Sequence, residues 1–218
     1  MAAAQMQGLA DALPELLGTV KIKPAGGEKG LGLFAVEDII PGQVLLVSRA
    51  MGFDHCQDVA GSHGARGPPD SRCTSDLVHQ IANKIHFDDD SSSSSEFYRL
   101  SAGSHLGPLE DAPASVVVAR IRGILDLNTH LSSLLGLGEP FDQCGFWLLP
   151  SFINNSCSEH NCIKEEYENV LIVKAVSTIP IGGEVLWEYV PGFWPHEEKQ
   201  AGLRGKWGER VILALKPH

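Results

Sequence analysis

The 218-residue sequence lacks the features that mark several large classes of proteins. Charged residues interrupt its apolar runs, so none reaches the length of about 18 residues that a membrane-spanning helix needs. Residues 1–18 contain no basic stretch followed by a continuous apolar core, and they are not rich in arginine. Neither a secretory signal nor a transit peptide is therefore predicted, and we expect an intracellular protein of the nucleus or cytoplasm.

Cysteines and basic residues are also scarce. The five cysteines are an odd number at no disulfide-scaffold spacing, which favours reduced thiols. Lysine and arginine number 17 against 27 aspartate and glutamate residues, which gives a formal net charge of -10. This balance disfavours direct nucleic-acid binding and is compatible with a basic peptide partner. The hydrophobic content of 43% suffices for one core, so we predict one domain with an insert.

Local patterns predict a mainly β protein with a helical insert. Two apolar runs within 30–47 flank the turn-forming Pro41–Gly42 pair, which predicts a β-hairpin. The β-branched or aromatic runs 171–176 and 184–190 are separated by proline and glycine, a pattern typical of strands joined by a turn. No internal repeat is predicted.

The intervening residues predict helices and loops. Apolar residues at helical spacing favour one or two helices within 114–137. Small, polar and turn-forming residues predict a loop at 54–70. The charged, low-complexity stretch DDDSSSSS (88–95) predicts a mobile surface loop, because it has little apolar surface to offset its ordering entropy. Residues 196–210 could form a helix.

Glycine and asparagine residues suggest where a ligand would bind. Gly30 and Gly32 lack a Cβ, so their backbone could come close to a cofactor, although tight strand packing gives the same pattern. Asn154 and Asn155 have amide side chains that donate and accept hydrogen bonds, as an adenine edge or a carboxylate requires. An ordinary asparagine-rich turn is the alternative.

Tyrosine and tryptophan residues near the C-terminus suggest a second part of the site. Tyr189 has a reference pKa of about 10, so at neutral pH it would act chiefly as a polar anchor, with proton acceptance secondary; a cross-strand core tyrosine is the alternative. Trp187, Phe193 and Trp194 could favour a methylammonium through cation–π attraction, or could fill a core.

Metal and nucleophile chemistry are not predicted. Cys157, His160 and Cys162 lie close in sequence, but a zinc site would need a fourth ligand from elsewhere. Ser156 has no nucleophile elbow around it. We therefore predict no metal and no covalent catalysis.

Three segments occur together in an order that is informative. They are KGLGLFA (29–35), LPSFINNSCSEHN (149–161) and GGEVLWEYV (182–190). They resemble the signature segments of SET-domain protein-lysine methyltransferases, usually Asn-His-Ser-Cys and Gly-Glu-Glu-(Leu/Val)-x-x-x-Tyr. The sequence is most similar to the SET domains of fungal proteins that combine tetratricopeptide repeats with SET, and more distantly to the SMYD group.

The resemblance implies a particular fold and domain organisation. The expected fold is the SET-domain β-clip, in which the two later segments form a pseudoknot. The SET domain would span 20–190 with an insert at about 54–140. Residues 1–19 would be a flexible lead-in, and 191–218 a divergent post-SET tail.

The resemblance also implies a reaction and a site. S-adenosylmethionine would be the methyl donor, the partner would be a protein or peptide carrying a lysine, and geometry would carry the catalysis. Tyr189 would be the catalytic residue at the lysine channel, lined by Trp187, Phe193 and Trp194. The residues expected at the cofactor are Lys29, Gly30, Leu31, Gly32, Asn154, Asn155 and Tyr189.

Three departures from the family pattern keep a second hypothesis open. Asn155 stands where the family has histidine, and Cys157 is followed by Ser-Glu-His-Asn, one residue longer than usual, so Asn161 receives no role. The Cys-rich post-SET segment is replaced by KWGERVILAL, with Glu209 at the place of an adenine-stacking aromatic residue. The alternative is a catalytically inactive SET module that binds a protein partner.

Overall fold

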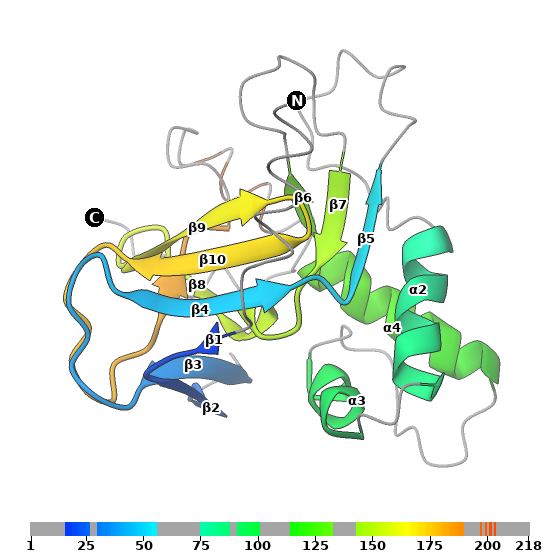
Figure 1. Ribbon diagram of the computed structural model, residues 1–218, viewed down its shortest axis with the longest axis horizontal. Helices are drawn as coiled ribbons and strands as arrows, with labels where there is room; N and C mark the ends of the chain where they lie inside the picture. Colours follow the sequence, from blue (N-terminus) through cyan, green and yellow to red (C-terminus); the bar gives the residue numbers. More distant parts are fainter. Residues whose placement is uncertain are drawn as a thin grey trace. The chain divides into compact units, whose positions relative to one another are not determined.

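The computed structural model describes residues 16–26, 30–55, 75–87, 91–100, 114–132 and 143–189, with 197, 199, 201 and 203 (Figure 1). The chain divides into two compact units: a terminal unit of Met1–Arg49 with Leu149–His218, and a central unit of Ala50–Leu148. The terminal unit contains all three signature segments. None of the helices in the described ranges is long and apolar enough to cross a membrane.

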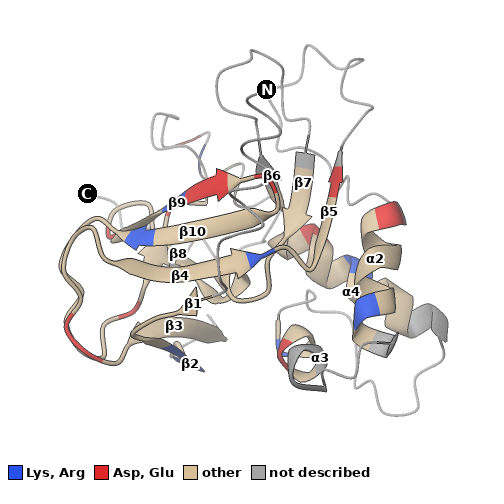
Figure 2. Cartoon of the chain, viewed as in Figure 1, with Lys and Arg blue, Asp and Glu red and all other residues tan. Residues whose placement is uncertain are grey.

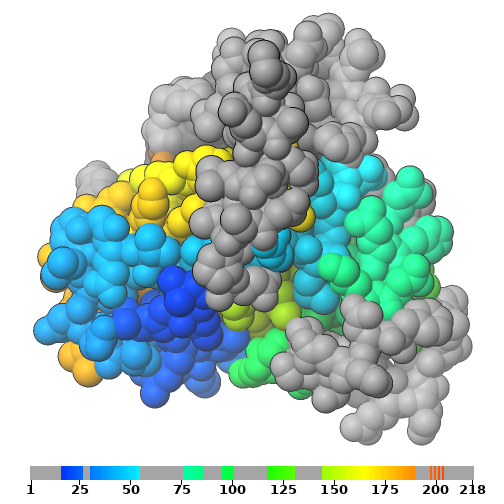
Figure 3. Space-filling view, in the orientation of Figure 1, coloured from blue at the N-terminus to red at the C-terminus, as the bar shows by residue number. Residues whose placement is uncertain are grey.

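A four-stranded antiparallel sheet forms the main layer of the terminal unit. Its strands, in spatial order, are β1 (Leu16–Leu17), β4 (Val44–Arg49), β10 (Val170–Ala175) and β9 (Cys162–Tyr167). The apolar runs of β4 and β10 are mostly buried, and this confirms the strand predicted at 171–176 up to Ala175. In the space-filling view, β9 and β10 (yellow) adjoin the N-terminal segments (blue) (Figure 3).

Two small ladders accompany this sheet. β2 (Val20–Pro24) pairs antiparallel with β3 (Leu31–Ala35), and β8 (Asn154–Asn155) pairs parallel with β11 (Leu186–Trp187). The hairpin predicted across Pro41–Gly42 is therefore wrong. The turn exists, with Gly42 at a φ of 88°, but β4 pairs with β1 and β10 instead of β3. A run of apolar residues can specify a strand but not its partner, which for β4 is β1 on one side and β10 on the other.

The terminal unit contains an internal repeat that the sequence did not predict. Residues 31–47 and 171–187, offset by 140 positions (179 minus 39), have the same succession of strand, turn and bridge, and nearly the same burial. Gly42 and Gly182, which are equivalent in this repeat, have φ values of 88° and 80°. The residues that are identical between the two copies are too few and too scattered for the repeat to be recognised in the sequence. They are Leu31, Ala35, Val36, Ile39, Gly42 and Leu46, each matched 140 positions later.

The two copies of the repeat bind each other through equivalent backbone hydrogen bonds. The bonds are Ile39 N to Ile179 O (2.9 Å), Ile179 N to Ile39 O (3.0 Å), Gly42 N to Ala175 O (2.8 Å) and Gly182 N to Ala35 O (2.9 Å). The turn after β3 and the turn after β10 thus satisfy each other's polar groups. Acidic residues lie on the turn after β3, at Glu37 and Asp38, and on β9, at Glu165 and Glu166 (Figure 2).

The central unit contains a sheet and three helices. The sheet has the order β5 (Gly52–His55), β7 (Gln143–Phe146), β6 (His130–Ser132), all antiparallel. The helices are α2 (Ser75–Phe87), α3 (Ser91–Tyr98) and α4 (Ala114–Asn128). These elements confirm the mainly β fold with a helical insert. Of the predicted helical segment 114–137, α4 is confirmed, whereas 130–132 form a strand.

The mobile loop predicted at 88–95 is wrong for residues 91–95, which form the start of α3. The apolar residues that follow the serines explain the helix. Phe97 is fully buried, and its ring centroid lies 5.4 Å from that of Phe146 in an edge-to-face arrangement. Residues 88–90, and 56–70 of the loop predicted at 54–70, lie outside the described ranges.

Candidate functional site

The candidate site is built around the parallel pair β8 and β11. Leu186 lies opposite Asn154, and Trp187 lies opposite Asn155. β8 follows a 3-10 turn, η2 (Pro150–Phe152), and Tyr189 comes two residues after β11. The two later signature segments therefore lie side by side, as the predicted pseudoknot requires.

The first signature segment joins them through Gly32. Residues 183–185 run antiparallel along β3, and Val185 N donates to Leu33 O at 2.8 Å. A Cβ built on Gly32 would lie 2.8 Å from both Asn154 Nδ2 and Glu184 Oε1. Real Cβ atoms essentially never come so close, so any larger residue at position 32 would force the Asn154 and Glu184 side chains, or β3, to move.

Asn154 links all three segments. Its Nδ2 donates to Leu31 O at 3.1 Å and to Glu184 Oε1 at 2.7 Å. The acceptor on Glu184 is charged, which strengthens this second hydrogen bond. Glu184, to which sequence reasoning assigned no role, thus holds the predicted cofactor residues Leu31, Gly32 and Asn154 in one cluster.

Gly30 lies in the turn between β2 and β3 and serves a different purpose. It has a φ of 77°, is exposed, and a Cβ added to it would meet no atom within 4 Å. A left-handed backbone conformation favours glycine, and the open space leaves the main chain accessible. Lys29, predicted beside it, lies outside the described residues.

Asn155, one of the residues predicted at the cofactor, binds Tyr189. The Asn155 side chain is buried, and its Oδ1 accepts a hydrogen bond from Tyr189 N at 2.9 Å. Its Nδ2 contacts Cys157 Sγ at 3.8 Å. The amide side chain therefore holds the backbone of the predicted catalytic residue.

The Tyr189 side chain is held at its other end. Its hydroxyl donates to Ile153 O at 2.8 Å. Although the residue keeps some exposed surface, burial raises the pKa of Tyr189 well above its ordinary value, and the nearby Glu184 carboxylate raises it further. The phenol is therefore neutral at physiological pH, and its one hydrogen is engaged by a backbone carbonyl.

Asn161 is a residue of this site that sequence reasoning missed. Its Nδ2 donates to Glu184 O at 2.8 Å, and its Oδ1 accepts from Leu186 N at 2.9 Å. It thus brackets the strand that leads to Tyr189. The available signal was an amide residue at the end of the second signature segment, but the uncertain register after Cys157 concealed it.

The three candidate metal ligands of this region do not converge. Cys162 is buried and its Sγ donates to Leu186 O at 3.3 Å, whereas His160 is exposed. Cys157 is half-buried, and burial raises the pKa of its thiol. Within the described ranges, no three His, Cys, Asp or Glu side chains group as a metal site.

The predicted lysine channel is described only in part. Trp187 is 4% exposed, and the ammonium of Lys164 lies 6.0 Å from its ring centroid, so the ring already contacts one cation. Phe193 and Trp194 lie outside the described residues.

Fold and site define a class of protein. The sequence model of the SET domain family matches residues 30–190, which is more than half of the chain and includes the two later signature segments and all of the first except Lys29. The chain belongs to the SET domain family. No curated protein sequence matches it significantly.

Similar solved structures are remote in sequence. The SET domain of LSMT bound to lysine and AdoHcy is 14% identical, with a TM-score of 0.49, over 92% of this chain and 55% of that one. The Chaetomium thermophilum polycomb repressive complex 2 is 15% identical, with a TM-score of 0.39, over 83% of this chain and 16% of that one. The chain thus spans about half, or less, of these two proteins' lengths.

Proposed function

We propose that the chain is an S-adenosylmethionine-dependent protein-lysine N-methyltransferase with Tyr189 as its catalytic residue. The observation that carries this proposal is the double anchoring of Tyr189, by Asn155 Oδ1 at its backbone and by Ile153 O at its hydroxyl. Methyl transfer needs an aligned amine in a fixed site more than it needs strong acids or bases.

The direction of the Tyr189 hydrogen bond decides what its hydroxyl can offer a substrate. Because its hydrogen is donated to Ile153 O, it presents only lone pairs to other groups. Those lone pairs can accept an N–H of a neutral lysine amine and orient the nitrogen lone pair. Its raised pKa keeps the phenol protonated, so Tyr189 would position the amine and would not remove its proton.

S-adenosylmethionine, when bound, supplies a methyl group on a sulfonium. The residues proposed to hold it are those of the first and second signature segments: Lys29, Gly30, Leu31, Gly32, Asn154 and Asn155. The exposed, left-handed Gly30 fits such a ligand, because a side chain there would fill space beside an accessible backbone. Asn154 fixes this segment against β8.

The substrate is proposed to be a lysine-bearing protein, histone or non-histone. The net charge of -10 favours a basic segment over nucleic acid. We also infer a nuclear or cytoplasmic location without membrane binding, and a closer kinship with the fungal tetratricopeptide-SET group than with other SET proteins.

Replacement of Tyr189 by Phe tests the proposal. Methyl transfer to core histones and to a protein extract would be followed with radiolabelled S-adenosylmethionine, and S-adenosylhomocysteine binding by calorimetry. We expect the rate to fall by about 10²-fold, as when one oriented polar group is removed from an active site, while binding is kept. Tyr167→Phe is the matched control, because its hydroxyl contacts Glu165 on β9. Equal rates for Tyr189→Phe and Tyr167→Phe would remove Tyr189 from the active site.

A second function has one observation in its favour. Both polar atoms of Asn155 make contacts inside the protein, to Tyr189 N and to Cys157 Sγ, at the position where relatives carry histidine. An inactive SET module that binds a protein partner would bind S-adenosylhomocysteine without methylating any protein in the same assay.

A further inference from the structure

One ion pair of the terminal unit lies immediately beside Tyr189. Lys199 Nζ is 2.6 Å from Glu188 Oε1, and the two side chains are only 12% and 18% exposed. The Lys174–Glu165 pair has the same distance but is 34% exposed on both sides. The shielded pair interacts in a lower dielectric, so its geometry is more strongly enforced than that of the surface pair.

Lys199 belongs to a segment near the C-terminus. Glu197, Lys199, Ala201 and Leu203 are helical in the part of this segment that the structure describes. Leu203 is fully buried, and Lys199 is paired with Glu188.

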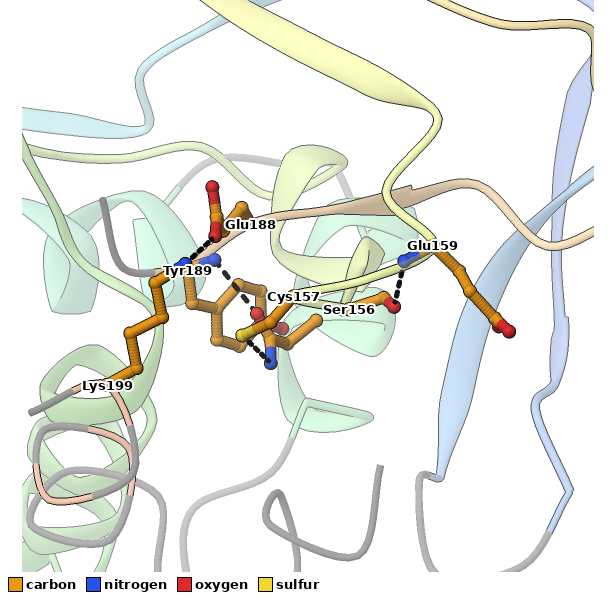
Figure 4. Close-up of polar contacts among 7 residues, drawn as sticks. Ser156, Cys157, Glu159, Glu188, Tyr189 and Lys199 are labelled. Carbon is orange, nitrogen blue, oxygen red and sulfur yellow. Dashed lines mark hydrogen bonds and ion pairs between the residues drawn. The ribbon is translucent and has the colours of Figure 1, made fainter. Parts of the chain in front are cut away.

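The ion pair is continuous with the contacts that hold Tyr189. Glu188 directly precedes Tyr189, whose N–H donates to Asn155 Oδ1. Figure 4 shows Lys199 meeting Glu188 beside Tyr189 and Cys157. Burial is the main cause that raises the pKa of the Cys157 thiol. The charge of Lys199 lowers this pKa and the charge of Glu188 raises it, so both side chains lie near Cys157 as well as Tyr189.

We propose that Lys199 and Glu188 are a positioning pair: their ion pair fixes the backbone that leads into Tyr189, and so fixes the orientation of Tyr189. The pair acts through Tyr189 and does not itself bind the reacting groups. The kinetic consequence rests on the proposed methyltransferase function. The structural consequence, protection of the Tyr189 amide, does not.

The test uses the full chain and two measurements. Amide hydrogen exchange at Tyr189, read by NMR, reports the bond to Asn155, and kcat per S-adenosylhomocysteine-binding site reports transfer. Lys199→Met and Glu188→Gln should each speed Tyr189 exchange by about tenfold or more. Each should also lower kcat by about 10- to 100-fold, with KM for S-adenosylmethionine within about threefold, the signature of a misplaced catalytic group.

Three further variants separate positioning from general stability. Lys199→Arg keeps the charge and should keep both readouts near wild type, and so should Lys174→Met, which breaks the exposed pair. The charge-swapped double variant Glu188→Lys with Lys199→Glu should recover most of the Tyr189 exchange protection. If Lys199→Met does not fold, this double variant decides: recovery supports the pair, and no recovery overturns it.

The test of the Lys199–Glu188 positioning role can be distinguished from the test of the methyltransferase function. If the wild-type chain transfers no methyl group, Tyr189 exchange alone decides, and faster exchange in Lys199→Met than in Lys174→Met supports the positioning pair. Identical Tyr189 exchange in these two variants overturns it, whatever the activity of the wild type.

Discussion

Replacing Gly32 by Ala tests the close contact on which the candidate site is built. The added Cβ would lie 2.8 Å from Asn154 Nδ2 and 2.8 Å from Glu184 Oε1, and 3.2 Å from the Cβ of Ala25. These distances are too short to persist, so either β3 shifts, or the Glu184 and Asn154 side chains move apart from the new Cβ and from each other.

Both forms of relief have a similar energetic consequence. Shifting packed backbone to admit one extra carbon costs about 1–3 kcal/mol. Turning Glu184 away loses the hydrogen bond from Asn154 to a charged acceptor, at about 1.5–3 kcal/mol. We therefore expect the free energy of unfolding to fall by about 2 kcal/mol, a large part of the 5–15 kcal/mol typical of folded domains.

A double-mutant cycle makes this prediction specific. Urea unfolding would be measured for Gly32→Ala, Glu184→Ala and the double variant, with an expected coupling of about 1 kcal/mol or more, because removing Glu184 removes part of the clash. Gly30→Ala with Glu184→Ala is the control cycle and should be additive, since a Cβ on Gly30 meets nothing within 4 Å. Additivity within about 0.5 kcal/mol for the Gly32 cycle would refute the reasoning.

Two other residues of the site give separate predictions. Asn161→Ala leaves Glu184 O and Leu186 N without their side-chain partner, and should lower the free energy of unfolding by about 2–4 kcal/mol in urea titration, whereas an effect below about 0.5 kcal/mol would contradict the bracketing role. Burial raises the pKa of Cys162 from 9.0 to about 12, so the folded protein retains a proton that the unfolded chain releases. Ionisation of this thiol should therefore leave the free energy of unfolding unchanged below about pH 9 and should lower it as the pH rises from 9 towards 12. In unfolding curves measured across this pH range, Cys162→Ala should show a smaller decline.

The elements that could be predicted from the sequence are those with strong local patterns. The β-branched run of β10 and the apolar spacing of α4 specify their own conformation, because each buries a face that its period defines. The juxtaposition of β8 with the strand leading to Tyr189 was predicted from family resemblance, not from any local property of Asn154 or Asn155.

The rest depended on tertiary partners that no local pattern encodes. β3 and β4 flank a real turn at Gly42, yet each pairs with a strand from elsewhere. The serines of α3 are weak helix formers, and the burial of Phe97 is a feature of the folded chain. Asn161 and Glu184 acquire their roles from each other's position, so neither is recognisable alone.

The reciprocal turns also constrain how the chain can fold. Ile39 and Ile179 are partners separated by 140 positions (179 minus 39), and the whole central unit lies between them in sequence. Contacts of such long sequence separation are made late and slow folding, although the entropy of closing the loop grows only with the logarithm of its length. During synthesis the turn at 35–43 stays without its partner until residues 175–183 have been synthesised, whereas all residues of the central unit are available earlier. Gly32, Asn154 and Glu184 can meet only in that late step, so the site forms only when the two copies of the repeat come together.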